Sequence, residues 1–544
     1  MLATAALAPT VAPAAAQATT VRVPFPRDPG TLTPLTFALG YPLLALVYDT
    51  ITWRDARGLP RPWLARSVQA LEGGRRVVVR LRDDLHWHDG RALTAGDVAF
   101  TYDFIRARRH PRFAPQLHAL ASVRARDART VEFGLRHPSI GFADQPLADV
   151  PILPAHVWRG VGSGLRAPAG APVGSGPYRL AGRRGDGGVQ LAAVRDYFRG
   201  RPAVDRVDVP VIPEATDMLA ALRRGNADAL PFTLTPEQVA RVASVSVRIA
   251  RGPLYLGTML MFNVRRPPFD RAEVRRTIAA ALDRRRIARA AGDGLPATTG
   301  FLHPQSRWAP PPTTLVPPRP GRSLAALGLP PVRELAPAHD RVRREAGRQV
   351  VLALRRAGAR ARLAVLSRAR LGRAVGEGGD GAPSFDVAIW SIPALASFDP
   401  DYLGALFGER GGGVLNRSGY RSAAFDRLAA QVAAAPTVGS RRHAVSALLA
   451  QLERDAPAVP LLFSEGAFAY DSTSPVDWTF VAGSGILDKR SLLRPARERG
   501  AFAGPSPPGA GDDGGDLRLL TVLGGGMLAV ALLLGGAAAL GRRS

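Results

Sequence analysis

The chain has 544 residues, a formal net charge of +27 at pH 7 and no cysteine. At about 150 residues per domain the length allows several lobes, and the absence of cysteine excludes disulfides, thiolate nucleophiles and cysteine-ligated metal centres. The positive charge is nearly all arginine and is spread along the chain, so we expect no nucleic-acid partner and only a mild attraction to anionic surfaces.

Residues 1–18 form an alanine-rich apolar run that ends in Ala16-Gln17-Ala18. Small residues in this pattern are typical of a signal-peptidase site, so we expect a secretory signal. The run lacks the positive residues that usually open such a signal. We therefore interpret residues 1–18 as a signal shortened at its start, with a flexible apolar tail as the alternative.

A strand, a tight turn and a capped helix are predicted in succession between residues 75 and 102. Residues 77–81 are mostly branched and apolar, which suits a partly buried strand, and Asp89-Gly90 is strong turn chemistry. Thr94 is a natural N-cap, and Asp97 would lie in the first helical turn, where its carboxylate favours the helix dipole.

Six short motifs in and around this segment occur in a fixed order. They are Tyr48-Asp49-Thr50, Pro62-Trp63-Leu64-Ala65, Leu81-Arg82-Asp83, Trp87-His88-Asp89-Gly90, Leu93-Thr94-Ala95 and Asp97-Val98-Ala99-Phe100-Thr101-Tyr102. Together they resemble family 5 of the extracellular solute-binding proteins, which are the dipeptide, oligopeptide and nickel receptors of ABC importers. Later segments extend the resemblance over most of residues 22–465; among them are Gly174-Ser175-Gly176-Pro177-Tyr178, Phe262-Asn263, Pro267-Pro268-Phe269-Asp270, Ala281-Leu282-Asp283-Arg284 and Asp455-Ala456-Pro457-Ala458-Val459-Pro460.

The resemblance implies an α/β, two-lobed periplasmic-binding-protein-like fold of type II with an extra inserted subdomain. Alternating strands and helices in residues 255–460 independently favour an α/β lobe. We expect lobe I to comprise residues 22–50, 172–250 and 461–495, the inserted subdomain residues 51–171, and lobe II residues 255–460. The family role implies a monomer without a catalytic residue or a cofactor.

Several later elements are predicted from local patterns. Residues 204–212, 254–263 and 386–390 are expected to be strands, and residues 215–224, 270–291 and 422–434 helices. In the helix after Asp270, Asp270 and Glu273 should form a capping box, and Val274, Ile278 and Leu282 should share the buried face.

The glycines of Gly174-Ser175-Gly176 predict a tight turn with positive φ rather than a phosphate cradle, because no Gly-Lys-Ser or Gly-Lys-Thr follows. Residues 309–383 fit the family pattern poorly and predict a shortened lobe.

The candidate binding residues lie mainly after the strand that ends at Trp390. In peptide-binding relatives an aspartate soon after this tryptophan pairs with the ligand's α-amino group, but residues 391–397 contain no acid. Asp399 or Asp401 could replace it, and capping of the next turn is an equally weighted role. The predicted ligand-binding set is Trp390, Phe398, Asp399, Asp401, Tyr402, Asn263, Asn416 and Tyr420. Asn263, Asn416 and Tyr420 are equally explained as structural polar groups.

Metal binding has little support in the sequence. His86 and His88 would share one face of an extended segment, but two imidazoles without a nearby cysteine or spaced glutamate are an incomplete set. We therefore predict no metal site.

The C-terminal region predicts a membrane anchor. Residues 500–516 are rich in Gly, Pro and Asp, as in a solvated linker, and residues 519–540 carry no charge over about the 20 residues that span a bilayer. Arg542 and Arg543 follow this segment, so the positive-inside rule places the C-terminus in the cytoplasm and the body outside. A buried hydrophobic helix is the alternative.

These observations predict the extracytoplasmic receptor of an ABC importer, with peptides or a similar small polar organic solute as ligand and permease subunits as partners. Two alternatives stay open at this point. One is a metal-chelate receptor of the nickel type, and the other is a surface interaction or sensing protein that keeps the fold without transport.

Overall fold

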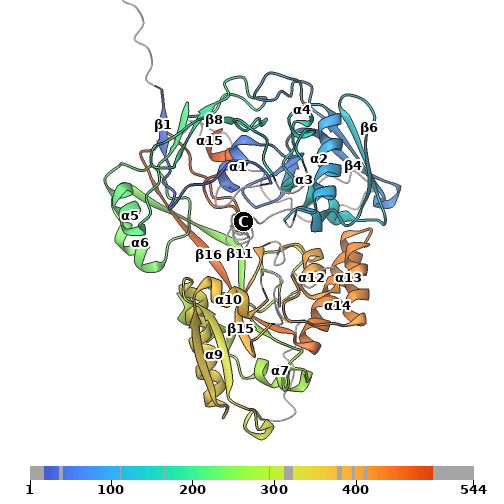
Figure 1. Cartoon of the computed structure of the whole chain (residues 1–544), viewed down its shortest axis with the longest axis vertical. Helices are drawn as coiled ribbons and strands as arrows, with labels where there is room; N and C mark the ends of the chain where they lie inside the picture. The colour runs from blue at the N-terminus through green and yellow to red at the C-terminus, as the bar shows by residue number, and fades with distance from the viewer. Residues whose placement is uncertain are drawn as a thin grey trace, which may run out of the picture.

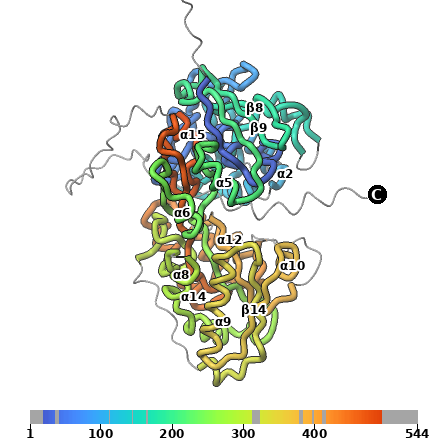
Figure 2. Tube along the Cα trace, turned by 90° about the vertical axis from the view of Figure 1, so that its left-hand side faces the viewer, coloured from blue at the N-terminus to red at the C-terminus, as the bar shows by residue number. Residues whose placement is uncertain are grey.

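The computed structural model of the whole chain describes residues 18–35, 41–110, 112–143, 145–162, 166–292, 294–311, 323–376, 383–394, 398–409 and 415–493. Two bodies lie end to end along the longest axis, with long strands passing between them (Figure 1). Figure 2 shows the same division from the side. The names lobe I and inserted subdomain denote the two parts of the upper body and lobe II the lower body, while the exact bounds expected for the three parts stay a prediction.

Lobe I is built on a four-stranded sheet of order β1-β10-β9-β8, in which only the β1–β10 pair is parallel. Its elements are β1 (Thr20–Arg22), α1 (Tyr41–Val47), β8 (Tyr178–Arg183), β9 (Val189–Ala193), β10 (Arg206–Val209), α5 (Ala215–Arg223), α6 (Pro236–Val242) and α15 (Lys489–Leu492). Helix α15 packs against the N-terminal part of lobe I. Its Lys489 Nζ lies 2.6 Å from Asp49 Oδ1, and both side chains are fully buried.

The inserted subdomain has its own antiparallel sheet of order β4-β5-β7-β6, covered by α2. Its elements are β2 (Thr52–Arg54), β3 (Pro60–Pro62), β4 (Ala65–Leu71), β5 (Arg76–Leu81), α2 (Ala95–Arg108), β6 (Leu120–Ala125), β7 (Thr130–Leu135), α3 (Pro146–Asp149) and α4 (Ala155–Trp158). The predicted start of α2 is confirmed: Thr94 is the N-cap, and its backbone N–H donates to Asp97 Oδ2 at 2.9 Å.

Lobe II contains a six-stranded mixed sheet of order β12-β16-β11-β15-β13-β14 with helices on both faces. Its elements are β11 (Val247–Phe262), α7 (Ala272–Ala280), α8 (Arg284–Gly292), β12 (Leu295–Pro296), β13 (Val332–Pro337), α9 (Arg341–Arg356), β14 (Ala361–Leu366), α10 (Arg368–Ala374), β15 (Val387–Ile392), α12 (Asp401–Phe407), α13 (Ala423–Ala433), α14 (Val438–Asp455) and β16 (Ala458–Asp471). Side chains alternate between the faces as a strand requires. Met259 and Met261 pack toward α12–α14, while Leu260 and Phe262 pack toward α8 and α9.

Two long antiparallel strands connect the bodies. Strand β11 has 16 residues and β16 has 14, and they pair from Val247 opposite Asp471 to Met261 opposite Ala458. Their register shifts between Pro253 and Gly257, where Tyr255 has φ of 58°. The pairing is thus irregular where the strands leave one body for the other, and we call this stretch the hinge.

The region predicted as one helix from residue 270 to 291 is two helices. It divides between α7 and α8, and α7 has Arg271 at its N-cap with no capping side chain, so the predicted Asp270–Glu273 capping box is wrong. Val274, Ile278 and Leu282 are all buried, as their spacing predicts. Arg275 is also buried. Its Nε donates at 3.0 Å to the carbonyl oxygens of Asp455 and Ala456, and these hydrogen bonds offset the cost of burying the charge.

The turn at residues 174–176 needs glycine for a different reason than the positive φ predicted from the sequence. Neither Gly174 nor Gly176 has positive φ; instead a Cβ on either would overlap a carbonyl oxygen of the α1 C-terminus, at Val47 or Leu46. Gly176 N–H donates to Val47 O at 2.8 Å. Close approach of two backbones therefore requires glycine here.

The predicted terminal segments lie largely outside the described residues. Of the signal segment 1–18 only Ala18 is described, and the linker 500–516 and the anchor 519–540 lie wholly outside. Among the residues that the structure does describe, no helix combines the length and apolar character needed to cross a bilayer.

Candidate functional site

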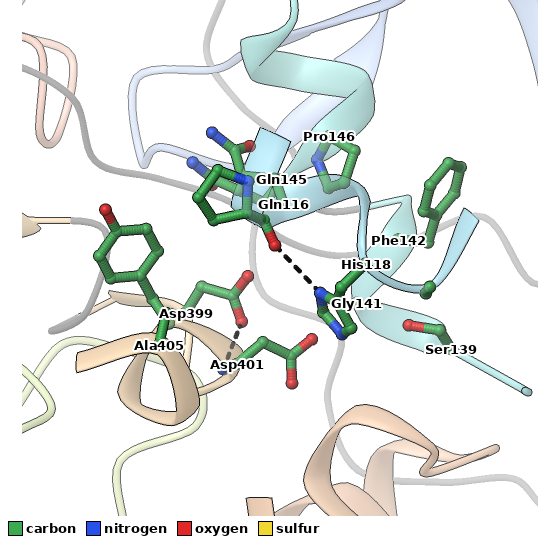
Figure 3. A pocket seen from close by; sticks show the side chains of 13 residues that line it. Gln116, His118, Ser139, Gly141, Phe142, Gln145, Pro146, Asp399, Asp401 and Ala405 are labelled. Atoms are coloured by element: carbon green, nitrogen blue, oxygen red, sulfur yellow. Dashed lines mark hydrogen bonds between the residues drawn. The ribbon is translucent and has the colours of Figure 1, made fainter. Parts of the chain in front are cut away.

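A small cavity lies between lobe II and the inserted subdomain. Asp399, Asp401, Tyr402 and Ala405 form its lower wall, at the start of α12 (Figure 3). The upper wall comes from the 3-10 helices at Ala114–Leu117 and Ile140–Phe142 and from the start of α3, with Gln116, His118, Ser139, Gly141 and Gln145 among its residues. Its volume is about 20 Å³, which is room for one water molecule. The bodies therefore touch along this side.

The lower wall carries two acids that one arginine holds in place. Arg441 of α14 is fully buried; its Nη2 donates to Asp399 Oδ1 at 2.7 Å, and its Nη1 lies 3.4 Å from Asp401 Oδ2. Asp399 Oδ1 also accepts the backbone N–H of Asp401 at 3.2 Å, so the expected capping role of this acid is real. The guanidinium carbon of Arg441 lies 4.7 Å from the centre of the Trp308 ring, which covers its face.

Asp399 and Asp401 share the guanidinium of Arg441, and each carboxylate lies in the field of the other. Burial and the neighbouring charge of Asp401 raise the pKa of Asp399 to about 7, although Arg441 acts in the opposite direction. Near neutral pH this group is therefore poised between its two protonation states. Such a pair can accept a proton or attract one cationic group.

The upper wall is supported from behind by a buried polar network around Asp149. This carboxylate is fully buried and accepts hydrogen bonds from Arg112 Nη2 at 2.9 Å, Gln116 Nε2 at 2.6 Å and the Tyr41 hydroxyl at 2.8 Å. A buried charge needs such partners to offset its lost hydration. The network fixes Gln116, and with it one side of the cavity, to the core of the upper body.

The two walls meet at Gly141 and Arg441. A Cβ on Gly141 would overlap the Arg441 guanidinium, so only a glycine lets the bodies approach this closely. Arg441 therefore serves both the acid pair below and the contact above.

Phe398 lies at the apolar side of the junction between the bodies. It clusters with Tyr255 of the hinge, Ala394 and Ala482, and its ring centre is 5.0 Å from that of Tyr255. Since Ala482 belongs to lobe I and Ala394 to lobe II, this cluster buries apolar surface from both bodies.

The other predicted residues do not line the cavity. Asn263 donates to the carbonyl oxygens of Pro383 and Phe385 at 3.2 and 3.1 Å, and Asn416 to those of Phe407 and Tyr420 at 2.9 and 2.7 Å. The Tyr420 hydroxyl donates to Asp455. Trp390 on β15 is half-buried against the core of lobe II.

Sequence reasoning missed three residues of this site. Gln116 and Gln145 stand in no motif, and nothing in their local sequence marks them. Arg441 did carry a signal, because it occupies the same helical face as Val445, Leu448 and Leu452, which are all buried. A charge on an apolar stripe is informative, since burying it demands a partner.

His88 is engaged in the backbone rather than available to a metal. Its Nδ1 accepts the Gly174 N–H at 3.2 Å, so Nε2 carries the proton that it shares with Gly176 O at 2.9 Å. Burial lowers the pKa of this imidazole, which keeps it neutral. Within the described ranges no three or more His, Cys, Asp or Glu side chains gather as a metal would require.

A second hollow, of about 270 Å³, lies on lobe II between α8 and α9. It is lined by Ala281, Asp283, Arg286, Ile287, Gln349, Ala353, Arg356 and Ala357. All of its walls come from one body, so it would not respond to movement at the hinge. The smaller cavity, with walls from both bodies, is therefore the better candidate site.

Comparison with known proteins places the chain in a family of bacterial solute-binding proteins. The family model described as bacterial extracellular solute-binding proteins, family 5 middle, matches residues 60–413. The oligopeptide-binding protein AppA of Bacillus subtilis is 28% identical over 257 residues, which are 46% of this chain and 47% of that protein. The matched part thus spans about half the length of this relative.

Solved structures share the fold. The ABC transporter substrate-binding protein CtaP of Listeria monocytogenes superposes with a TM-score of 0.76 at 21% identity, covering 88% of this chain and 99% of that chain. NikZ of Campylobacter jejuni, solved in complex with Ni(L-His), gives a TM-score of 0.70 at 17% identity, covering 87% and 97%. At these identities the likeness establishes the two-lobed α/β architecture and no more.

Proposed function

Because the chain belongs to family 5 of the bacterial extracellular solute-binding proteins, we propose that it is the extracytoplasmic receptor of an ABC importer. Its ligand in this proposal is a peptide or a similar small polar organic solute. The relative AppA is named as an oligopeptide-binding protein, which supports this ligand class.

One observation carries the proposal: the candidate cavity takes its two walls from two bodies that are joined by a hinge. Strands β11 and β16 connect the bodies, so rotation at their irregular stretch would part Asp399 from Gln116. A cavity of about 20 Å³ cannot hold a peptide, and ligand entry therefore requires this opening. Ligand contacts made only in the closed form would then shift the population toward closure.

We assign the predicted ligand-binding residues different parts in this scheme. Asp399, Asp401 and Tyr402 would face the solute from lobe II, where the acid pair offers a partner for a cationic group. Phe398 and Trp390 would supply apolar surface near the hinge and on β15. Asn263, Asn416 and Tyr420 would hold the loops of lobe II through the hydrogen bonds described above.

The experiment is to purify the full chain natively and identify co-purifying small molecules by mass spectrometry. A panel of di- to tetrapeptides is then tested by thermal shift, since a ligand that binds only the native state raises Tm. A peptide that stabilises the protein is the expected result. The absence of any response across the panel, together with no co-purifying solute, would overturn the proposal.

A metal-chelate ligand is the competing possibility, because NikZ was solved with Ni(L-His). The engagement of both His88 nitrogens by backbone groups weighs against a direct role for this histidine. Adding the nickel–histidine complex to the panel separates the two ligand classes.

We further propose that residues 519–540 anchor the protein in the membrane, with the body outside and the C-terminus in the cytoplasm. The support is the uncharged run of sequence followed by Arg542 and Arg543. Deletion of residues 519–544 should move the protein from the membrane fraction to the soluble fraction. An unchanged distribution would contradict the anchor.

A further inference from the structure

Two glutamines of the inserted subdomain line the candidate cavity on the wall opposite the acid pair (Figure 3). Gln116 is 8% exposed and Gln145 is 2% exposed. Gln116 belongs to the 3-10 helix Ala114–Leu117, and Gln145 directly precedes α3. Both carboxamides are thus buried in a position that a solute would meet when the bodies close.

The orientation of each carboxamide is fixed by the chemistry of its partners. Gln116 contacts two acceptors, the Arg112 carbonyl oxygen at 3.0 Å and Asp149 Oδ2 at 2.6 Å, so the atom facing them must be the donor Nε2. Gln145 contacts Arg54 Nη2 at 2.8 Å, and because a guanidinium only donates, the atom facing it must be Oε1. Flipping the Gln116 amide would place its oxygen against two acceptors, and flipping the Gln145 amide would place its NH2 group against a donor, so each orientation is determined.

Each glutamine is left with one unused polar atom. Gln116 Oε1, an acceptor, and Gln145 Nε2, a donor, have no hydrogen-bond partner among the residues that the structure describes. Buried polar groups in native proteins are almost always paired, so two unpaired groups on one cavity wall call for an external partner. That partner must offer both an acceptor and a donor.

We propose that Gln116 and Gln145 form a subsite that reads one backbone edge of a peptide solute. Gln145 Nε2 donates to a carbonyl oxygen and Gln116 Oε1 accepts an amide N–H; in an extended peptide the C=O and N–H of one residue point to the same side, so both can meet this wall. This inference rests on the proposed function and narrows the ligand class to amide-bearing solutes such as peptides.

Other functional groups fit this wall less well. A carboxylate has only acceptors and would face Gln116 Oε1 without a proton to share, whereas an ammonium has only donors and would leave Gln145 Nε2 unpaired. An ester keeps the carbonyl oxygen but lacks the N–H. The two glutamines are also uncharged, whereas the opposite wall carries Asp399 and Asp401, so the two walls would recognise different parts of one solute.

The test uses Gln145→Glu in the full chain, because this change keeps an oxygen for Arg54 and replaces only the free donor. Gln69→Glu on β4 is the matched control, since Gln69 is exposed and outside the cavity and receives the same added charge. Affinity is measured by calorimetry for the best peptide of the panel and for its analogue in which an ester replaces one amide. Each amide of the peptide is replaced in turn.

In the wild type we expect one ester position to weaken binding by about tenfold, which is the loss of one hydrogen bond. Gln145→Glu should weaken peptide binding by at least as much, and Gln69→Glu should not. Gln116→Leu should abolish the difference between peptide and ester at that position, which identifies Gln116 as the partner of the N–H.

The outcomes separate this inference from the function beneath it. If the wild type binds no peptide, the proposed function fails and the subsite with it. If the wild type binds peptide, but every ester analogue and Gln145→Glu bind equally well, only the subsite is overturned. A ligand-bound crystal structure with water alone on Gln116 Oε1 and Gln145 Nε2 would overturn it as well.

Discussion

A single arginine controls the charge of the wall that lobe II presents to the cavity. Arg441 is fully buried and serves two acids, Asp399 and Asp401. Without it, two carboxylates would face each other in a place that water hardly reaches. The energetic role of Arg441 is therefore to permit this arrangement, more than to add net stability, because a buried ion pair roughly balances its own desolvation.

Replacing Arg441 with methionine tests this role. The change removes the cation that contacts both acids, and we expect the free energy of unfolding to fall by about 3 kcal/mol at pH 8. Chemical denaturation measures it, with Arg442→Met as the control, since Arg442 is the neighbouring arginine and is exposed. Equal effects of the two substitutions would contradict the assigned role.

The raised pKa of Asp399 predicts how stability depends on pH. Burial and Asp401 raise this pKa from 3.8 to about 7 in the folded protein. Between pH 4 and 7 the folded state then keeps a proton that the unfolded chain has lost, so stability falls as the pH rises through this window. The contribution is complete below about pH 4 and absent above the folded pKa, with a slope of up to ~1.4 kcal/mol per pH unit.

The measurement is the free energy of unfolding from pH 4 to 8 for the wild type and for Asp399→Asn, which keeps the shape but cannot ionise. The difference between the two curves should slope downward to about pH 7 and then level off. A flat difference would show that Asp399 titrates at its ordinary value. Arg441, Arg307, Asp401 and the cavity-lining His118 are the charged or titratable neighbours that set the shape of the curve.

At the level of residues, three of the predicted binding residues lie together at the candidate cavity, and their role in binding stays a prediction. Asp399, Asp401 and Tyr402 were expected at a cleft from their place after the Trp390 strand, and they line the cavity between the bodies. Gln116 and Gln145 were not predicted, because what distinguishes them is a partner fixed by tertiary structure: Asp149 for one, Arg54 for the other. No local pattern contains that information.

Secondary-structure elements were easier to predict than their ends and their joints. The α2 cap at Thr94 depends on residues three apart and was correct, whereas the helix expected over 270–291 breaks between α7 and α8. Periodicity placed Val274, Ile278 and Leu282 on the buried face, yet it could not show that the backbone turns at residues 281–283. Arg275, next to Val274, is buried as well and donates to the carbonyl oxygens at the end of α14.

The short 3-10 helix Ile140–Phe142 is the element that sets how closely the bodies approach. A Cβ at Gly141 would overlap the guanidinium of Arg441, which cannot move freely because Asp399 and Trp308 hold it. We expect Gly141→Ala to disfavour the closed arrangement while leaving each body folded. Overpacking of this kind costs ~1–3 kcal/mol, so the closed population should fall by on the order of tenfold.

Small-angle scattering and ligand affinity measure this effect of Gly141→Ala. The radius of gyration should increase and the affinity for the solute should fall, with little change in thermal unfolding. Gly160→Ala is the control, because a Cβ there meets no atom within 4 Å. A compact, tightly binding Gly141→Ala protein would show that the contact with Arg441 does not limit closure.

Over the whole molecule, the two bodies contact each other on more than one side of the hinge strands. One is the Gly141–Arg441 contact at the cavity. Another is an ion pair in which Arg341, at the start of α9, donates through both terminal nitrogens to Glu237 of α6, at 2.7 and 3.1 Å. Helix α6 packs beside the upper parts of β11 and β16, while α9 covers the sheet of lobe II, so this pair bridges the bodies.

The Glu237–Arg341 pair should act as a weak electrostatic latch on the closed form. Both side chains are about half exposed, and such pairs contribute ~0.2–1 kcal/mol in dilute salt. Glu237→Arg should therefore lower the closed population by roughly twofold to fivefold, and the added Arg341→Glu change should restore it. High salt should screen the latch in the wild type and in the double variant alike.

The closed population is measured by energy transfer between two labels. The chain has no cysteine, so Ala70→Cys and Ala290→Cys provide two labelling positions, one on each body. If Glu237→Arg leaves the closed population unchanged at low salt, the pair is a surface contact without a part in closure, and the cavity wall with the hinge strands alone governs how the bodies meet.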